Sequence, residues 1–334
     1  MKVLFTTVNR KNLVCMDYLA QFEKAFAKVA ECEWAGMGHP QFRKGENMSQ
    51  TVKRVMPDAD WVITCGRPPV IVRGRRSYKV AMVTLDLHGN HRLRLGMHGF
   101  IDYLNNVGLD AILMPYTQLA TSGGKAPKNF DQKIYLKKLK MHILHLPLSI
   151  NPELFKPSNK PKKYDVAFLA SHGSRVYPFR QLIWNKLPAL AKEHRWEVIM
   201  RGKPQGGSLK RDINKYLEKG YIVGPKYAET LALTKVFIFG LGRYKYPTMK
   251  FTEGMACRTC LMTDPPLTAK ELHYIPDWNF VNINPKNWER KLVYYVSHDE
   301  EREGIARNGY DTVIKYHTND IRAKQLLTFL EEHR

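Results

Sequence analysis

The sequence lacks long hydrophobic runs: nowhere do about 18 apolar residues follow one another, so no membrane-spanning helix is expected. The first residues, MKVLFTTVNRKN, turn polar too early to hold the apolar core of a secretory signal. Cysteine is also scarce, and its five residues are an odd number, which fits a reducing compartment without a disulfide framework. Hydrophobic residues make up 44%, an ordinary globular value. These features predict a soluble, cytoplasmic protein.

Acidic residues are few relative to basic ones. The 334 residues include 53 Lys+Arg and 31 Asp+Glu, which gives a formal net charge of +22. Residues 51–250 carry the whole of this excess, because the charges of the two ends of the chain cancel. Such a field attracts a polyanion, whether nucleic acid, nucleotide diphosphate or an acidic surface. The alternative is a charge that serves only solubility, although a solvated surface usually mixes both signs.

Apolar runs alternate with amphipathic stretches along the chain, which is typical of α/β proteins with parallel sheets covered by helices. Residues 151–163, NPELFKPSNKPKK, contain three prolines and four lysines and are predicted to be a linker. The expected organisation is a Rossmann-like domain over 1–150, a second over 164–317 and a C-terminal helix over 318–334. Ligands of open α/β sheets bind beyond the carboxyl ends of the strands, so the site is expected in a cleft between the domains.

The apolar periodicity gives a coarse set of elements. In the first half, we expect a helix over 17–30 and strands over 3–7, 61–65, 80–85, 111–114 and 143–148. In the second half, we expect strands over 165–170, 196–200, 221–223, 235–239, 260–263 and 279–283. The helices expected there cover 178–193, 209–219, 251–257, 288–296, 299–317 and 319–333.

In the second half, basic and small residues gather at three places where an expected strand ends or an expected helix begins. The sequence SHGSR follows strand 165–170, RGK follows strand 196–200, and KFTEG begins the helix near 251–257. Backbone N–H groups and cations at these places suit a phosphate, and a carboxylate there can accept hydrogen bonds from both hydroxyls of a ribose. Helix capping or a solvated surface would explain any single one of them. The candidate nucleotide-binding residues are Arg175, Arg180, Arg201, Lys203, Lys250, Thr252 and Glu253.

Four segments resemble a known superfamily: DVAFLASHGSRVYPFR, YIVGPKYAETLALTKVFIFG, MKFTEGMACRTCLMTDPP and EREGIARNGYDTVIKYHTNDIRAKQLLTFL. They are similar to the C-terminal half of GT-B glycosyltransferases of the group one type, and within it to the spore-maturation-protein-like branch. The resemblance covers residues 165–334 and is vague over 1–150. It implies two Rossmann-like domains with a cleft between them, and a nucleotide-sugar donor, with a UDP-sugar expected.

The resemblance also implies roles for particular residues. Glu253 would contact the ribose, while Arg175 or Arg180 and Arg201 or Lys203 would lie near the diphosphate. The loop 223–226 would lie near the base, and its alternative is a plain Gly-Pro turn. The family often carries a second Glu eight positions before the first, but here that position is Lys245. The departure puts contacts to the donor sugar in doubt more than nucleotide binding.

The first half offers candidates for catalysis and for the acceptor. A general base needs a carboxylate or imidazole, and Asp86 and His88 follow the strand expected over 80–85. Turn capping and surface exposure are the alternatives for this pair. Basic residues surround them, and they could bind an anionic acceptor or form a solvated face. The candidate polyanion-binding residues are Arg67, Arg73, Arg75, Arg76, Arg92 and Arg94.

The expected function is transfer of a sugar to a hydroxyl of an anionic acceptor. Hydroxylated modified bases in DNA are the first choice, since the superfamily includes phage enzymes that glucosylate such bases, and a base in a duplex would have to be flipped out. The alternatives are a cell-surface polymer or glycan as acceptor, and a non-catalytic nucleic-acid-binding protein with a decayed transferase fold. No metal is expected. The DAD of residues 58–60 is interpreted as a turn at a strand entry, and the CxxC of residues 257–260 is a lone pair.

Overall fold

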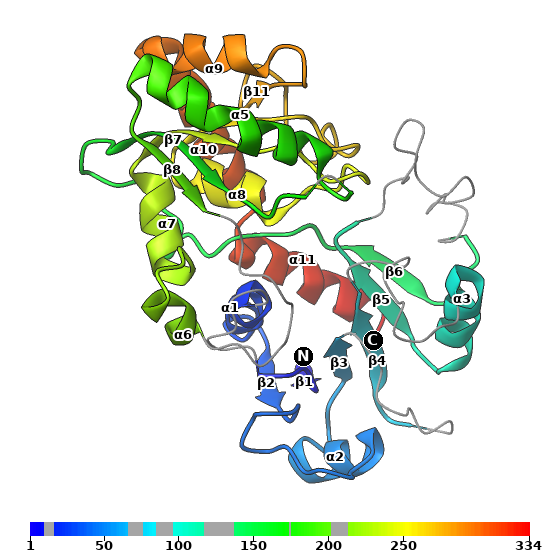
Figure 1. Ribbon diagram of the computed structural model, residues 1–334. Coiled ribbons are helices and arrows are strands. Elements are labelled where there is room, and N and C mark those ends of the chain that lie inside the picture. Colours follow the sequence, from blue (N-terminus) through cyan, green and yellow to red (C-terminus); the bar gives the residue numbers. More distant parts are fainter. Residues whose placement is uncertain (10–16, 66–75, 85–95, 117–136, 174, 202–212) are drawn as a thin grey trace.

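The computed structural model describes residues 1–9, 17–65, 76–84, 96–116, 137–173, 175–201 and 213–334. The chain forms two α/β units that follow one another in sequence (Figure 1). Each is built on a parallel sheet with helices packed against it. All pairs of neighbouring strands run parallel, so the carboxyl ends of the strands in each sheet meet at a single edge. This is the fold class expected from the sequence.

The first sheet has six strands in the order β2-β1-β3-β4-β5-β6. Its central strands are continuous apolar runs because helices cover both faces, and Trp61 is fully buried. The strands are β1 (Lys2–Phe5), β2 (Glu31–Trp34), β3 (Trp61–Cys65), β4 (Lys79–Val83), β5 (Ala111–Met114) and β6 (His142–His145). The helices of this part are α1 (Asp17–Phe26), α2 (Met48–Val55) and α3 (Gly96–Asn106).

The second sheet has five strands in the order β11-β10-β9-β7-β8. It encloses the largest apolar core, which includes the fully buried Phe237 and Trp288. The strands are β7 (Tyr164–Leu169), β8 (Val198–Arg201), β9 (Thr234–Ile238), β10 (Cys260–Thr263) and β11 (Val281–Asn282). The helices are α5 (Pro178–His194), α6 (Ile213–Glu218), α7 (Gly224–Ala232), α8 (Met249–Ala256), α9 (Trp288–Ser297) and α10 (Asp299–Tyr316).

The chain crosses between the two sheets twice, and the two crossings lie side by side. Ile150 and Thr318 form a parallel bridge, and the Ser149 hydroxyl donates to the Asn319 side chain over 2.7 Å. The last helix, α11 (Asn319–Glu332), then returns to the first sheet and packs beside α1 (Figure 1). Residues 151–163 lie along the second core, where Phe155 is buried. The C-terminal helix therefore ties the first part of the molecule to the end of the second.

Most of the expected elements are confirmed, and the exceptions have physical reasons. The strand expected over 221–223 is wrong: these residues lead into α7, for which Val223 is the N-cap and Pro225 lies in the first turn. The sequence analysis missed α7 itself, and it also missed β2, α2 and α3. The four residues ECEW of β2 carry two acids, α2 is largely polar, and α3 contains two glycines, so none of them shows a long apolar period.

A buried histidine at the second crossing makes stability depend on pH. His317 is 1% exposed, its Nε2 lies 2.8 Å from the Leu272 carbonyl, and its Nδ1 lies 2.8 Å from Nη2 of Arg322. Burial, helped by the Arg322 charge, lowers the pKa of His317 to about 3. The unfolded chain takes up a proton near pH 6.5, while the folded chain resists it down to about pH 3.

Stability is therefore expected to be full above pH 6.5 and to fall as the pH drops towards 3, by at most about 1.4 kcal/mol per pH unit from this group. Urea unfolding at pH 7.5, 6.5 and 5 measures the slope. His317→Gln removes the titrating group, so its unfolding free energy should depend less steeply on pH than that of the unchanged protein. Equal slopes for the two proteins would contradict the assignment.

Among the described residues, no helix is both long enough and apolar enough to cross a membrane.

Candidate functional site

The carboxyl edges of the two sheets meet through a pair of tyrosine rings. Tyr116 follows β5 of the first sheet, and Tyr246 lies between β9 and α8 of the second. Their rings stack with centroids 4.6 Å apart and planes 13° from parallel. Tyr244 stacks on Tyr246, with ring centroids 5.8 Å apart. The loop that leads into α8, the helix of Lys250, Thr252 and Glu253, thus lies where the two halves touch.

The loop after β9 packs tightly on the loop after β7. Gly240 and Gly242 allow this approach, because a Cβ on Gly240 would lie 2.7 Å from Phe179 and one on Gly242 would lie 3.0 Å from Tyr177. The backbone N–H of Arg243 donates to the Val176 carbonyl over 3.0 Å. The two loops therefore form one connected rim at the carboxyl edge.

The buried side chain of Arg180 links the two loops of this rim by hydrogen bonds. Its Nε donates to the Gly240 carbonyl and its Nη1 donates to the Ser171 carbonyl over 3.2 Å, so it joins the ends of β9 and β7. The side chain is 3% exposed and lies over the ring of Tyr177, and burial lowers its pKa. This placement favours a positioning role for Arg180 rather than direct contact with a diphosphate.

Lys245 and Asp264 form an ion pair behind the same rim. Asp264 follows β10, is 5% exposed and also accepts the backbone N–H of Leu241 over 2.6 Å. Lys245 has φ of 52°, in the left-handed region that non-glycine residues seldom adopt. The loop between Leu241 and Lys245 is thus tied at both ends to one buried carboxylate.

Helix α8 presents an uncapped N-terminus at this edge. Its N-cap residue, Thr248, makes no capping hydrogen bond, and its first turn contains no acidic residue. The first N–H groups of the helix and its dipole therefore favour an anion, and Lys250 in the first turn adds a positive charge.

Glu253 lies one turn further along α8 and is held by a tyrosine from the neighbouring helix. The Tyr227 hydroxyl, from the first turn of α7, donates to Oε2 of Glu253 over 3.0 Å. Burial and the charge of this carboxylate raise the pKa of Tyr227 well above its usual value, so the phenol keeps its proton and remains a donor. Glu253 itself is half-buried.

The remaining nucleotide-binding candidates of the second half are spread more widely. Arg175 is exposed in the loop after β7, and Arg201 is exposed at the end of the edge strand β8. Thr252 is 1% exposed and its hydroxyl donates to the Met249 carbonyl over 2.9 Å, which is a bond internal to α8. Lys203 lies outside the described residues.

In the first half, Arg76 is engaged in contacts within the protein. It pairs with Asp110 and donates to the Gly108 carbonyl over 2.8 Å, near the starts of β4 and β5. The amino edge of the sheet is the opposite one from the edge that carries Tyr116, so this arginine stabilises strand entry. The other first-half candidates all fall outside the described residues: Asp86, His88, Arg67, Arg73, Arg75, Arg92 and Arg94.

The DAD before β3 has the structural role expected of it. Asp58 pairs with Lys2, and Asp60 accepts the Lys2 backbone N–H over 2.8 Å and pairs with Arg334 at 2.6 Å. Within the ranges that the structure describes, no group of three or more His, Cys, Asp and Glu side chains comes together to hold a metal ion.

Sequence reasoning missed the partners that support the site. Tyr227 is 26 residues from Glu253, and Asp264 is 19 residues from Lys245, so only the packing of helices and strands brings them together. Tyr116 and Tyr246 belong to different halves of the chain. No local spacing could have signalled these three contacts.

Comparison with known proteins agrees with this arrangement. Residues 180–328 match the protein family described as Glycosyl transferase-like, and the matched range includes both α8 and the loop after β9. No curated protein matches the sequence.

Solved structures show that the fold is that of GT-B glycosyltransferases, with two Rossmann-like domains. A glycosyltransferase from Rickettsia africae superimposes with a TM-score of 0.64 at 12% identity, covering 99% of this chain and 98% of that one. Sucrose-phosphate synthase from Thermosynechococcus elongatus gives 0.63 at 12% identity over 99% and 98% of the two chains. TarM from S. aureus gives 0.52 at 12% identity over 80% of this chain and 55% of that one.

Proposed function

We propose that the protein transfers a sugar from a nucleoside diphosphate sugar to a hydroxyl group of an acceptor. The observation that carries the proposal is the half-buried Glu253, oriented by Tyr227 one turn beyond the uncapped start of α8. A carboxylate, a helix N-terminus and a lysine within one short helix match the ribose and diphosphate of such a donor. The family match over 180–328 supports the same reading.

In this mechanism the carboxylate of Glu253 accepts hydrogen bonds from the two ribose hydroxyls, which fixes the nucleotide. The bond between the sugar C1 and the diphosphate oxygen breaks, and a bond between C1 and the acceptor oxygen forms. The diphosphate leaves with two electrons, and its charge is stabilised by the start of α8, Lys250 and the exposed Arg175. The acceptor proton passes to a base, for which Asp86 and His88 remain the candidates.

The nucleotide is proposed to be UDP. TarM, whose fold this chain shares, has been crystallised in complex with Fondaparinux, alpha-GlcNAc-glycerol and UDP. Arg201 and Lys203, near the end of β8, and residues 223–226, at the start of α7, are proposed to complete the donor site.

The acceptor is proposed to be anionic, because residues 51–250 carry the whole net charge of +22. Hydroxylated bases in DNA are the first acceptor to test, with Arg67, Arg73, Arg75, Arg92 and Arg94 as the proposed backbone contacts. An acidic cell-surface polymer has the same charge complementarity and is the second.

A donor screen followed by a transfer assay tests the function. UDP, GDP, ADP and dTDP are each added in a thermal-shift experiment, and the matching nucleotide sugars are then incubated with duplex DNA containing 5-hydroxymethylcytosine or with teichoic acid. We expect UDP to raise the melting temperature and labelled sugar to appear on one acceptor. Stabilisation without transfer or hydrolysis of any donor would favour a decayed transferase that only binds. No stabilisation by any nucleotide would overturn the proposal.

Filter binding to duplex DNA across a salt series separates the two acceptors. A DNA-modifying enzyme that contacts several phosphates should lose affinity steeply between about 50 and 200 mM salt. Weak binding without such a slope would remove DNA as the acceptor.

A further inference from the structure

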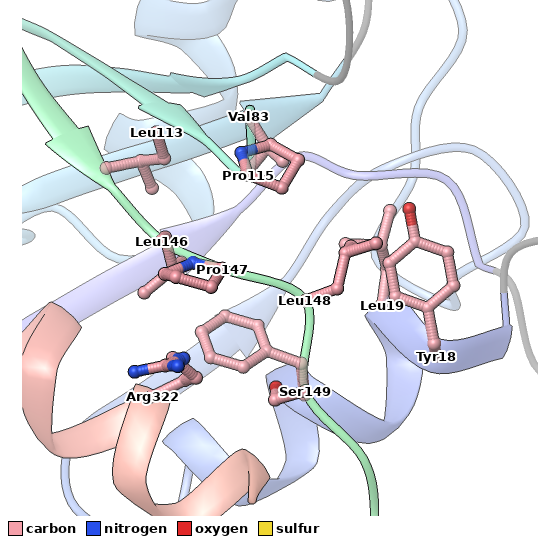
Figure 2. Close-up of a pocket in the computed structure, with 11 residues that line it drawn as sticks. Tyr18, Leu19, Val83, Leu113, Pro115, Leu146, Pro147, Leu148, Ser149 and Arg322 are labelled. Atoms are coloured by element: carbon pink, nitrogen blue, oxygen red, sulfur yellow. The ribbon is translucent and has the colours of Figure 1, made fainter. Parts of the chain in front are cut away.

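A hollow lined mainly by apolar side chains lies at the carboxyl edge of the first sheet, apart from the proposed donor site. It encloses about 430 Å³ of empty space with its open mouth included, so the closed part holds only a small group. The wall is formed by the ends of β4 and β5, the segment after β6, and the helices α1 and α11 (Figure 2). The lining residues are Tyr18, Leu19, Phe22, Val83, Leu113, Pro115, Leu146, Pro147, Leu148, Ser149 and Arg322.

Arg322 is the one charged residue of this lining, and it is 9% exposed. In Figure 2 it lies on the side of the hollow formed by α11, across from Tyr18 and Leu19 of α1. Its Nη1 donates to Gln325 over 3.0 Å and its Nη2 donates to His317 over 2.8 Å. Gln325 carries no charge, and His317 is neutral because its pKa is lowered to about 3.

The guanidinium therefore has no carboxylate partner among the residues that the structure describes. Its Nε is buried and makes no hydrogen bond. Burial lowers the pKa of Arg322 to about 10, but the group stays positively charged at neutral pH. A buried charge is costly unless it is paired, so an arginine in this state has an unmet need for an anion.

Other buried arginines of the chain satisfy that need within the protein. Arg302 is 3% exposed and pairs with Asp299 at 2.7 Å, and the half-buried Arg76 pairs with Asp110. Arg180, the buried arginine described above, donates hydrogen bonds to two backbone carbonyls. Arg322 differs because it borders an open hollow and has no carboxylate partner among the described residues.

We propose that this hollow binds a small organic acid, whose carboxylate pairs with Arg322 and whose short apolar body packs against Leu19, Leu146 and Leu148. An aliphatic or small aromatic acid satisfies both halves of the lining, whereas a free inorganic anion would leave the leucine and proline surfaces exposed to water. The site is distinct from the donor site, since none of its lining residues belongs to α7, α8 or the loop after β9.

Calorimetric titration of the full chain with butanoate, hexanoate and benzoate tests the proposal, with hexan-1-ol and inorganic phosphate as comparison probes. We expect one acid to bind per chain, more tightly than either the alcohol or phosphate. Arg322→Met removes the charge at similar length and should weaken binding at least tenfold. Leu148→Phe keeps Arg322 but narrows the hollow, and should weaken hexanoate more than butanoate.

Arg290→Met is the matched control, because it removes an exposed arginine from α9 of the other domain and should leave binding unchanged. Failure of every acid to bind would overturn the proposal, as would equal binding to the unchanged protein and to Arg322→Met. Phosphate binding as tightly as the acids would overturn the part of the proposal in which the apolar body of the acid packs against the leucines. If Arg322→Met does not fold, Leu148→Phe still decides. The titrations involve no sugar transfer, so their outcome is independent of the proposed activity.

Discussion

Glu253→Ala is expected to weaken binding of UDP about 100-fold. The carboxylate is proposed to accept two ribose hydroxyls, and a hydrogen bond to a charged group contributes about 1.5–3 kcal/mol, of which part is recovered by water in the variant. Isothermal titration with UDP measures the change directly and does not require the acceptor to be known. The fold should survive, because Glu253 is only half-buried.

Two further variants make this result specific. Tyr227→Phe removes the hydroxyl that orients Glu253, so UDP affinity should fall by a smaller factor, about fivefold to tenfold. Glu229→Ala removes an exposed carboxylate from the same helix as Tyr227 and should leave affinity unchanged. Unchanged UDP binding by Glu253→Ala, or an equal loss in Glu229→Ala, would show that Glu253 does not hold the ribose.

The elements that could be predicted from the sequence are those whose burial is continuous. The strands β5 and β10 are buried throughout and β3 is buried except at Cys65, and the expected bounds of all three agree with the structure. The edge strand β2 is less buried and carries two glutamates, so its apolar signal is weak. The strand expected over 221–223 had the right residue types, but the Gly-Pro that follows begins a helix whose position is decided by packing on β9.

The candidate site divides in the same way. The positions of Glu253 and Lys250 on a short helix could be predicted, because the elements that place them, β9, α8 and β10, are consecutive in the chain. Charge alone does not tell a ligand-binding arginine from a structural one. Arg76 and Arg180 are as basic as Arg175, but the first pairs with Asp110 and the second with two carbonyls. Such partners are brought together only by the folded chain.

The departure at position 245 also has an explanation that sequence could not supply. A lysine there reverses the charge expected from the family resemblance, yet in the structure it pairs with the buried Asp264. Because Asp264 also holds the Leu241 backbone, the pair fixes the loop that carries Tyr244 and Tyr246 against Tyr116. The loop between β9 and α8 is thus ordered by a cation on the loop and an anion at the end of β10.

Arg180→Met is expected to lower the free energy of unfolding by about 2–4 kcal/mol. The variant fills a similar volume but leaves the carbonyls of Gly240 and Ser171 without their donor in a buried setting, and each unmet group costs about 1–3 kcal/mol. Urea unfolding of the full chain measures the loss. UDP affinity should fall as well, because the rim formed by the loops after β7 and β9 loses its internal fastening.

Arg175→Met is the comparison variant, since it removes an exposed arginine from the loop after β7. It distinguishes an arginine that contacts the nucleotide from one that positions the loops around it. Its unfolding free energy should change by less than about 0.5 kcal/mol, while UDP binding should weaken if Arg175 meets the diphosphate. If Arg180→Met instead loses UDP affinity while its free energy of unfolding is unchanged, Arg180 contacts the nucleotide directly. Its guanidinium, which is 3% exposed, would then have to leave both carbonyls when the donor binds.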